Sequence, residues 1–88
     1  MHPSRMLAEA IQLARQLGYR VREDVLEGAG GGHCYYHGQK WLLLDLTQST
    51  DEQLNDVLDA LRAEPGVQQL GMSPALAQHL NPPLTQAA

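Results

Sequence analysis

The chain has 88 residues, of which 43% are hydrophobic and 18% charged, and its formal net charge is -4. This length allows one domain with a thin core, and the composition excludes a disordered chain. The single cysteine excludes an intrachain disulfide, and no apolar run approaches the ~20 residues that a membrane-spanning helix requires.

These features predict a cytoplasmic protein. A small secreted domain with so thin a core would usually need disulfides, and Met1–Arg5 do not lead into an apolar signal-peptide run. An acidic chain lacks the clustered Lys and Arg that give most nucleic-acid affinity, so we expect no nucleic-acid partner. Because no apolar run is long enough to span a bilayer, we expect no membrane partner either. A local basic patch stays open, because the first 22 residues hold only Glu9 against Arg5, Arg15, Arg20 and Arg22.

Residues 4–17 form the first predicted helix. Apolar residues recur at helical spacing, Ser4 is placed to cap the N-terminus, and Gly18 is placed to end the helix. Its apolar stripe must pack on another element, and the next segments supply a sheet.

Three β-prone segments follow this helix. Residues 19–26 alternate at first and predict an edge strand, and the glycine-rich residues 28–32 predict a flexible turn after it. Residues 33–37 and 40–46 flank Gly38-Gln39 and predict a hairpin.

The register of this hairpin decides which side chains are buried. An even-length loop pairs Tyr36 with Trp41 and places Cys34 beside Leu43. An odd-length loop instead places Cys34 and Tyr36 on one face with Leu42, Leu44 and Leu46. We favour the odd loop because it gives one consistently apolar face, which buries Cys34. The opposite face then carries His33, Tyr35, His37, Trp41 and Leu43, beside Arg20 and Arg22 if the first strand joins the same sheet.

Two more helices are predicted after the hairpin. Ser49 and Glu52 form a capping box ahead of an apolar stripe, and this helix ends near Pro65. Its acidic residues, Asp51, Glu52, Asp56 and Asp59, are expected to face solvent. Ser73-Pro74 begins a short helix that reaches about Leu80.

The segment from His33 to His37 is the only dense cluster of reactive side chains. On a strand, Cys34 and His37 point to opposite faces, while His33 and His37 share a face but lie ~13 Å apart at ~3.3 Å per residue. These ligands are too few and too dispersed for structural zinc, so we expect no metal and no cofactor. A nucleophilic Cys34 needs a base such as His33 or His37, and the favoured register buries this thiol.

A glycine pair and a cysteine, Gly31-Gly32-His33-Cys34, precede Gly38, the run Leu42–Leu46 and the helix start Glu52-Gln53-Leu54. Over residues 17–62 this pattern resembles small uncharacterised bacterial proteins that carry Gly-Gly-x-Cys, a hairpin and a Leu-Asp pair. The resemblance implies a bacterial, cytoplasmic origin, and it implies no reaction and no catalytic residue.

We therefore predict an α+β two-layer sandwich over residues 1–80, with a disordered tail at 81–88. It consists of a helix, a three-stranded antiparallel sheet, a second helix on the same face, and a short C-terminal helix at the sheet edge. The exposed face predicts a non-catalytic interaction or regulatory module that binds a protein partner or forms a homodimer. The contact residues are expected to be Tyr35, His37, Trp41 and Leu43. The alternative is a thiol- or metal-dependent enzyme centred on Cys34 with His33 or His37.

Overall fold

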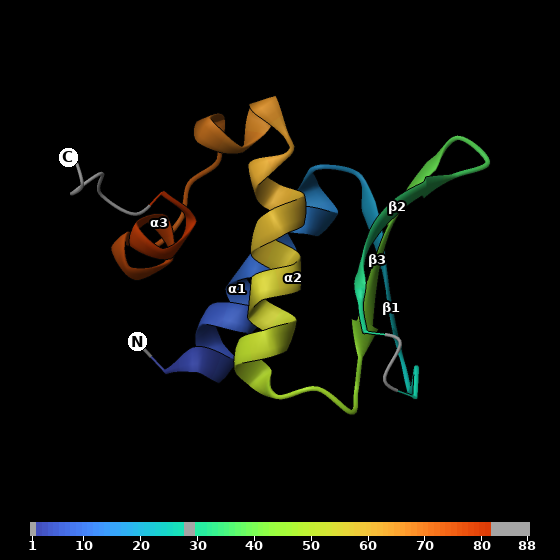
Figure 1. Cartoon of the computed structure of the whole chain (residues 1–88). Helices are drawn as coiled ribbons and strands as arrows, with labels where there is room; N and C mark the ends of the chain where they lie inside the picture. Colours follow the sequence, from blue (N-terminus) through green and yellow to red (C-terminus); the bar gives the residue numbers. More distant parts are fainter. Residues whose placement is uncertain (1, 28–29, 82–88) are drawn as a thin grey trace, which may run out of the picture.

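The computed structural model describes residues 2–27 and 30–81, in which an α+β fold confirms the predicted class. Its elements in chain order are α1 (Pro3–Gln16), β1 (Tyr19–Asp24), β2 (Gly32–Tyr36), β3 (Gln39–Asp45), α2 (Thr50–Arg62), the 3₁₀ helix η1 (Pro65–Gln69) and α3 (Pro74–Leu80). Figure 1 shows their arrangement. Gly28 and Ala29 of the predicted turn and residues 82–88 of the predicted tail lie outside the described residues.

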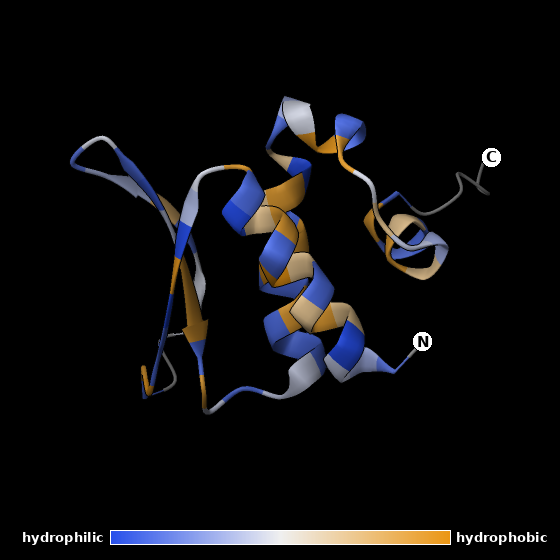
Figure 2. Cartoon of the chain, turned by 180° about the vertical axis from the view of Figure 1, so that it is seen from behind, coloured by the Kyte–Doolittle hydropathy of each residue, from blue (hydrophilic) through white to orange (hydrophobic). Residues whose placement is uncertain are grey.

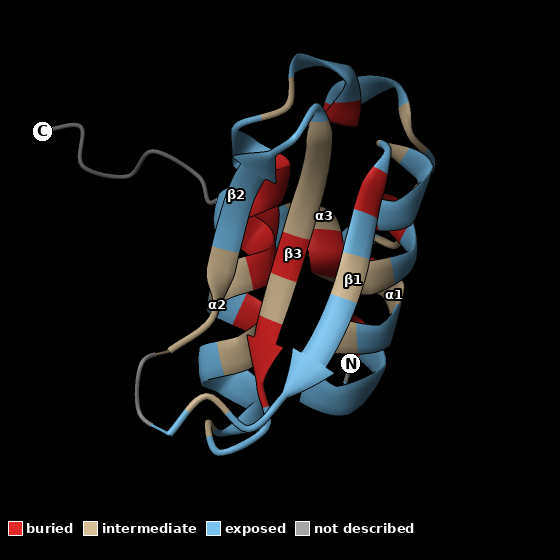
Figure 3. Ribbon diagram, turned by 90° about the vertical axis from the view of Figure 1, so that its right-hand side faces the viewer, coloured by how far each residue is buried: buried red, intermediate tan, exposed pale blue. Residues whose placement is uncertain are grey.

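The sheet is mixed, so the prediction of an entirely antiparallel sheet is wrong. Its strand order is β1-β3-β2, with β3 in the centre (Figure 3). β2 pairs antiparallel with β3 through a hairpin, but β1 pairs parallel with β3. The chain changes from one edge to the other after β1, since Leu26 and Gly30 both bond to Asp45 at the end of β3 and β2 then begins at the far edge.

Asp45, the last residue of β3, holds this crossing in place. Its side chain is completely buried. Oδ1 accepts hydrogen bonds from the amide of Leu26 at 3.2 Å and from the amide and hydroxyl of Thr47 at 3.0 and 2.7 Å. Oδ2 accepts one from the amide of Gly30 at 3.3 Å. The hydrogen bonds from Thr47 lower the pKa of Asp45, because they stabilise the carboxylate.

Gly31 lets β2 and α2 approach the central strand at the same crossing. A Cβ on this residue would overlap the carbonyl oxygen of Leu43 and would lie 2.9 Å from Oδ2 of Asp56. Asp56 therefore turns toward the sheet and is only partly exposed, unlike its exposed neighbours Glu52 and Asp59. Burial, followed by the charges of Asp59 and Glu52, raises the pKa of Asp56.

α1 and α2 cover one face of the sheet (Figure 2). The residues that they bury are apolar. The capping box of α2 is confirmed, with Ser49 and Glu52 bonded to each other's amides at 3.2 and 2.9 Å. α1 is capped by His2 rather than by the predicted Ser4, because the His2 Nδ1 accepts from the Ser4 amide and Pro3 opens the helix. The core consists of Met6, Ala10, Leu13, Ala14, Tyr19, Leu42, Leu44, Leu54, Val57, Leu58, Ala60, Leu61, Val67, Leu76 and Leu80.

α3 lies on the far side of α1 and α2 from the sheet (Figure 1), so the prediction that it packs at the sheet edge is wrong. Two charged side chains fix its ends. Glu9 of α1 accepts from the amide and hydroxyl of Ser73, the N-cap, at 2.6 and 2.7 Å. Arg62 of α2 donates to the carbonyl oxygens of His79 and Leu80 at 2.9 and 3.0 Å. A negative group at the N-terminus and a positive group at the C-terminus both stabilise a helix, because each faces the helix-dipole end of opposite charge.

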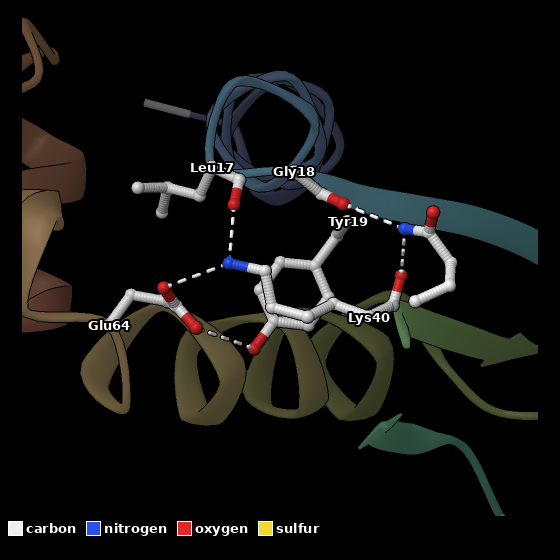
Figure 4. A network of polar contacts seen from close by, with 6 residues as sticks. Leu17, Gly18, Tyr19, Lys40 and Glu64 are labelled. Carbon is white, nitrogen blue, oxygen red and sulfur yellow. Dashed lines mark hydrogen bonds and ion pairs between the residues drawn. The ribbon is translucent and has the colours of Figure 1, made fainter. Parts of the chain in front are cut away.

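Lys40 joins four elements at the other end of β3 (Figure 4). Its Nζ donates to the carbonyl oxygen of Leu17, just past α1, and forms a 3.0 Å ion pair with Glu64, just past α2. The hydroxyl of Tyr19 in β1 donates to the same carboxylate at 3.3 Å. Burial, and then the charge of Glu64, raise the pKa of Tyr19.

Candidate interaction surface

The hairpin has a two-residue turn, so the favoured odd-length register is wrong. Tyr36 pairs with Gln39 and Cys34 with Trp41. His37 and Gly38 form the turn with φ of 51° and 76°, the left-handed pair that a type I′ turn requires. This turn gives the side-chain grouping of an even-length loop, and Cys34 is exposed rather than buried.

The register separates the predicted contact residues. Trp41 and Leu43 lie on the sheet face that no described helix covers, as predicted. Tyr35 alternates onto the helix side, and His37 lies in the turn, where its ring stacks on that of Tyr36 with 4.0 Å between centroids. We define the outer face as the uncovered side of the sheet, formed by Arg20, Arg22, Cys34, Tyr36, Trp41 and Leu43.

Two adjoining hollows indent the outer face, and each has a volume of about 260 Å³. Arg22 and Leu43 belong to both. The first hollow is completed by Cys34, Tyr36 and Trp41. The second is completed by Asp24 and Leu26, near the crossing that Asp45 holds. Strand alternation in β1, β2 and β3 thus places two neighbouring, mostly apolar hollows on the outer face, and Arg22 lines both of them.

The outer face is more basic than the chain as a whole. The guanidinium carbon of Arg20 lies 5.9 Å from the ring centroid of Trp41, a cation–π contact. Arg22 lies 3.5 Å from the carboxylate of Asp24, but both side chains are more than half exposed, so this pair is weak. Both arginines keep most of their capacity to bind a carboxylate.

The alternative reactive site is not assembled. His33 lies on the helix side, where its ring meets that of Tyr19 edge to face with 6.4 Å between centroids. Cys34 alternates to the outer face, so the thiol and the neighbouring imidazole point to opposite sides of the sheet. Within residues 2–27 and 30–81, no group of three or more His, Cys, Asp or Glu side chains is placed to hold a metal ion.

Sequence reasoning missed Cys34 and Tyr36 as outer-face residues, because the wrong register assigned positions 34 and 36 to the buried side. Arg20 and Arg22 were expected beside the exposed face, and they lie on it. No family model, curated protein or solved structure matches the chain. No helix in the described part of the chain has the length and apolarity to cross a membrane.

Proposed function

We propose that this chain is a non-catalytic protein-interaction module and that its outer face binds an acidic segment of a partner protein that also carries apolar side chains. The observation that supports it most directly is the hollow lined by Trp41, Cys34 and Leu43 on a sheet whose two long helices lie on the opposite side. An apolar, aromatic patch of this kind is typical of a contact surface.

The side chains that line the hollows favour docking of apolar groups. Both hollows share Arg22 and Leu43, and Asp24 supplies the only carboxylate among their lining residues. A thiol enzyme would also need a base oriented on Cys34, and His33 faces the other way. The arrangement supports docking rather than catalysis.

The charges on the outer face indicate which kind of partner fits it. The chain as a whole carries a net charge of -4, but the outer side of β1 carries two arginines, Arg20 and Arg22, with Asp24 as their acidic neighbour. Two copies stacked face to face would bring four guanidinium groups together, which disfavours a homodimer through this face. A partner with carboxylates beside leucine- or phenylalanine-like side chains would satisfy both the arginines and the hollows.

Trp41 is the only tryptophan, so its fluorescence reports directly on the outer face. The test titrates the protein with the capped peptides Glu-Leu-Glu-Leu-Glu and Lys-Leu-Lys-Leu-Lys. We expect the acidic peptide to give a saturable blue shift of the emission and the basic peptide to give none. Arg22→Glu should abolish the shift, while Arg5→Glu, the same charge change at an exposed residue of α1, should leave it intact.

Two results would reject this proposal. An emission unchanged by both peptides, or shifted equally by both, would remove the argument from charge. A salt-dependent quenching by short single-stranded RNA, with no response to the acidic peptide, would instead support base stacking on the same aromatic face.

A further inference from the structure

The outer edge of β2 is less protected than the other edge of the sheet. β1, at the opposite edge, carries Arg20, Arg22, Glu23 and Asp24, the kind of charges that prevent strand addition. β2 has no Lys, Arg, Asp, Glu or Pro, and Tyr35 and Tyr36 are 72% and 61% exposed. An exposed aromatic strand without protecting charges readily pairs with another strand.

The register shows which backbone groups are free on this edge. The two-residue turn closes on the pair Tyr36–Gln39, which makes this a hydrogen-bonded pair, and such pairs alternate along an antiparallel ladder. Cys34 therefore directs its amide and carbonyl toward Trp41, while His33 and Tyr35 direct theirs away from β3. Among the described residues, nothing outside the ladder bonds to the backbone of His33 or Tyr35.

We propose that β2 pairs antiparallel with β2 of a second copy about a two-fold axis at Cys34, which joins the two sheets into one of six strands. In this register His33 lies opposite Tyr35 of the second copy, so both residues with free backbone groups form hydrogen-bonded pairs. Cys34 lies opposite its own equivalent in a non-hydrogen-bonded pair, where facing side chains come closest.

A second copy suits this edge because the strand carries no formal charge, so its self-pairing brings no like charges directly opposite each other. Five paired residues form a small contact by the standards of permanent dimers, so the association is expected to be weak and concentration-dependent.

Disulfide trapping tests the register. Two Cα atoms in a non-hydrogen-bonded antiparallel pair lie about 4.5 Å apart, within the range of about 4.4–6.8 Å that a disulfide allows. Diamide takes two electrons and two protons from a pair of Cys34 thiols, forming one S–S bond and a hydrazine. The control is Cys34→Ala/Tyr36→Cys, with a thiol on the same strand and face but about 14 Å from its equivalent in the proposed register.

We expect the wild-type disulfide dimer to form roughly ten-fold faster than that of the control, because pairing raises the effective thiol concentration. Equal rates would overturn the register. Sedimentation equilibrium of the reduced protein should show a rising dimer fraction from micromolar to millimolar concentration, and a monomer throughout would overturn the dimer.

Two variants should block the dimer while preserving the fold. Tyr35→Pro removes an amide that the ladder to β3 does not use, and Pro is tolerated at such edge sites. His33→Lys adds the kind of charge that protects natural edges. Circular dichroism checks that both variants fold. A folded variant that dimerises as strongly as wild type would overturn pairing through β2 without bearing on the outer face, whose arginines both variants retain.

Discussion

Replacement of Gly31 by alanine tests the close approach of β2, β3 and α2. The added Cβ would overlap the Leu43 carbonyl oxygen, which belongs to the central strand and cannot rotate away, and would also crowd Oδ2 of Asp56 at 2.9 Å. Overpacking of this kind costs about 1–3 kcal/mol, and a rigid backbone neighbour favours the upper part of that range. For a domain of this size the melting temperature should fall by roughly 5–20 °C.

The assay is urea and thermal unfolding followed by far-ultraviolet circular dichroism. Gly71→Ala is the matched control, because a Cβ there meets nothing within 4 Å, and its stability should change by no more than about 0.5–1 kcal/mol. Asp56→Ala should raise stability more in the Gly31→Ala background than in wild type, since it removes one of the two clashes. A Gly31→Ala protein as stable as wild type would refute the described crossing of the chain.

Three further predictions concern the polar contacts. Lys40→Met should cost about 1.5–3 kcal/mol in urea unfolding, because it removes the ammonium group that binds Glu64 and the Leu17 carbonyl and leaves Glu64 only its bond from Tyr19. Arg22→Met should cost under about 0.5 kcal/mol, because its ion pair is exposed, and equal losses would contradict the network. Because the pKa of Asp45 is lowered in the fold, its carboxylate should stabilise the protein above about pH 4, and this stabilisation should be lost as the pH falls through the pKa of Asp45 in the folded state. Because the pKa of Asp56 is raised, Asp56→Asn should stabilise the protein at pH 7 and not in acid. Parallel curves of stability against pH for wild type, Asp45→Asn and Asp56→Asn would disprove both assignments. Arg62→Ala should raise the rate of amide hydrogen exchange in α3 by roughly ten-fold, which corresponds to about 1.4 kcal/mol of local stability, with little change in β3. An equal change in exchange throughout the protein would show that Arg62 does not hold α3 separately.

Local patterns predicted the helices well, because caps and apolar spacing act within a few residues. Ser49 with Glu52, and Ser73 with Pro74, have the bonds and positions that their sequence indicates. Gly18 follows α1 with a φ of 96°, as expected of a residue that ends a helix.

The sheet was predicted less well, because its order depends on contacts between distant residues. No local signal shows that the carboxylate of Asp45 binds the amides of Leu26 and Gly30, and these bonds accompany the crossing that makes β1 parallel to β3. The hairpin register failed for a different reason. His37 takes a left-handed conformation that is uncommon for a residue other than glycine, and Leu46 lies beyond the end of β3 and is 52% exposed, so it adds nothing to the apolar face assumed for it.

The central position of β3 has a consequence during synthesis on the ribosome. β1 and β2 do not neighbour each other in the sheet, so neither can form its native strand pair until β3 (Gln39–Asp45) has been synthesised. A nascent chain that ends before Gln39 can form α1 but no strand pair, and the exposed tyrosines of β2 emerge before their partner does. Pauses in translation before this point would therefore prolong the interval in which the chain is most prone to aggregate.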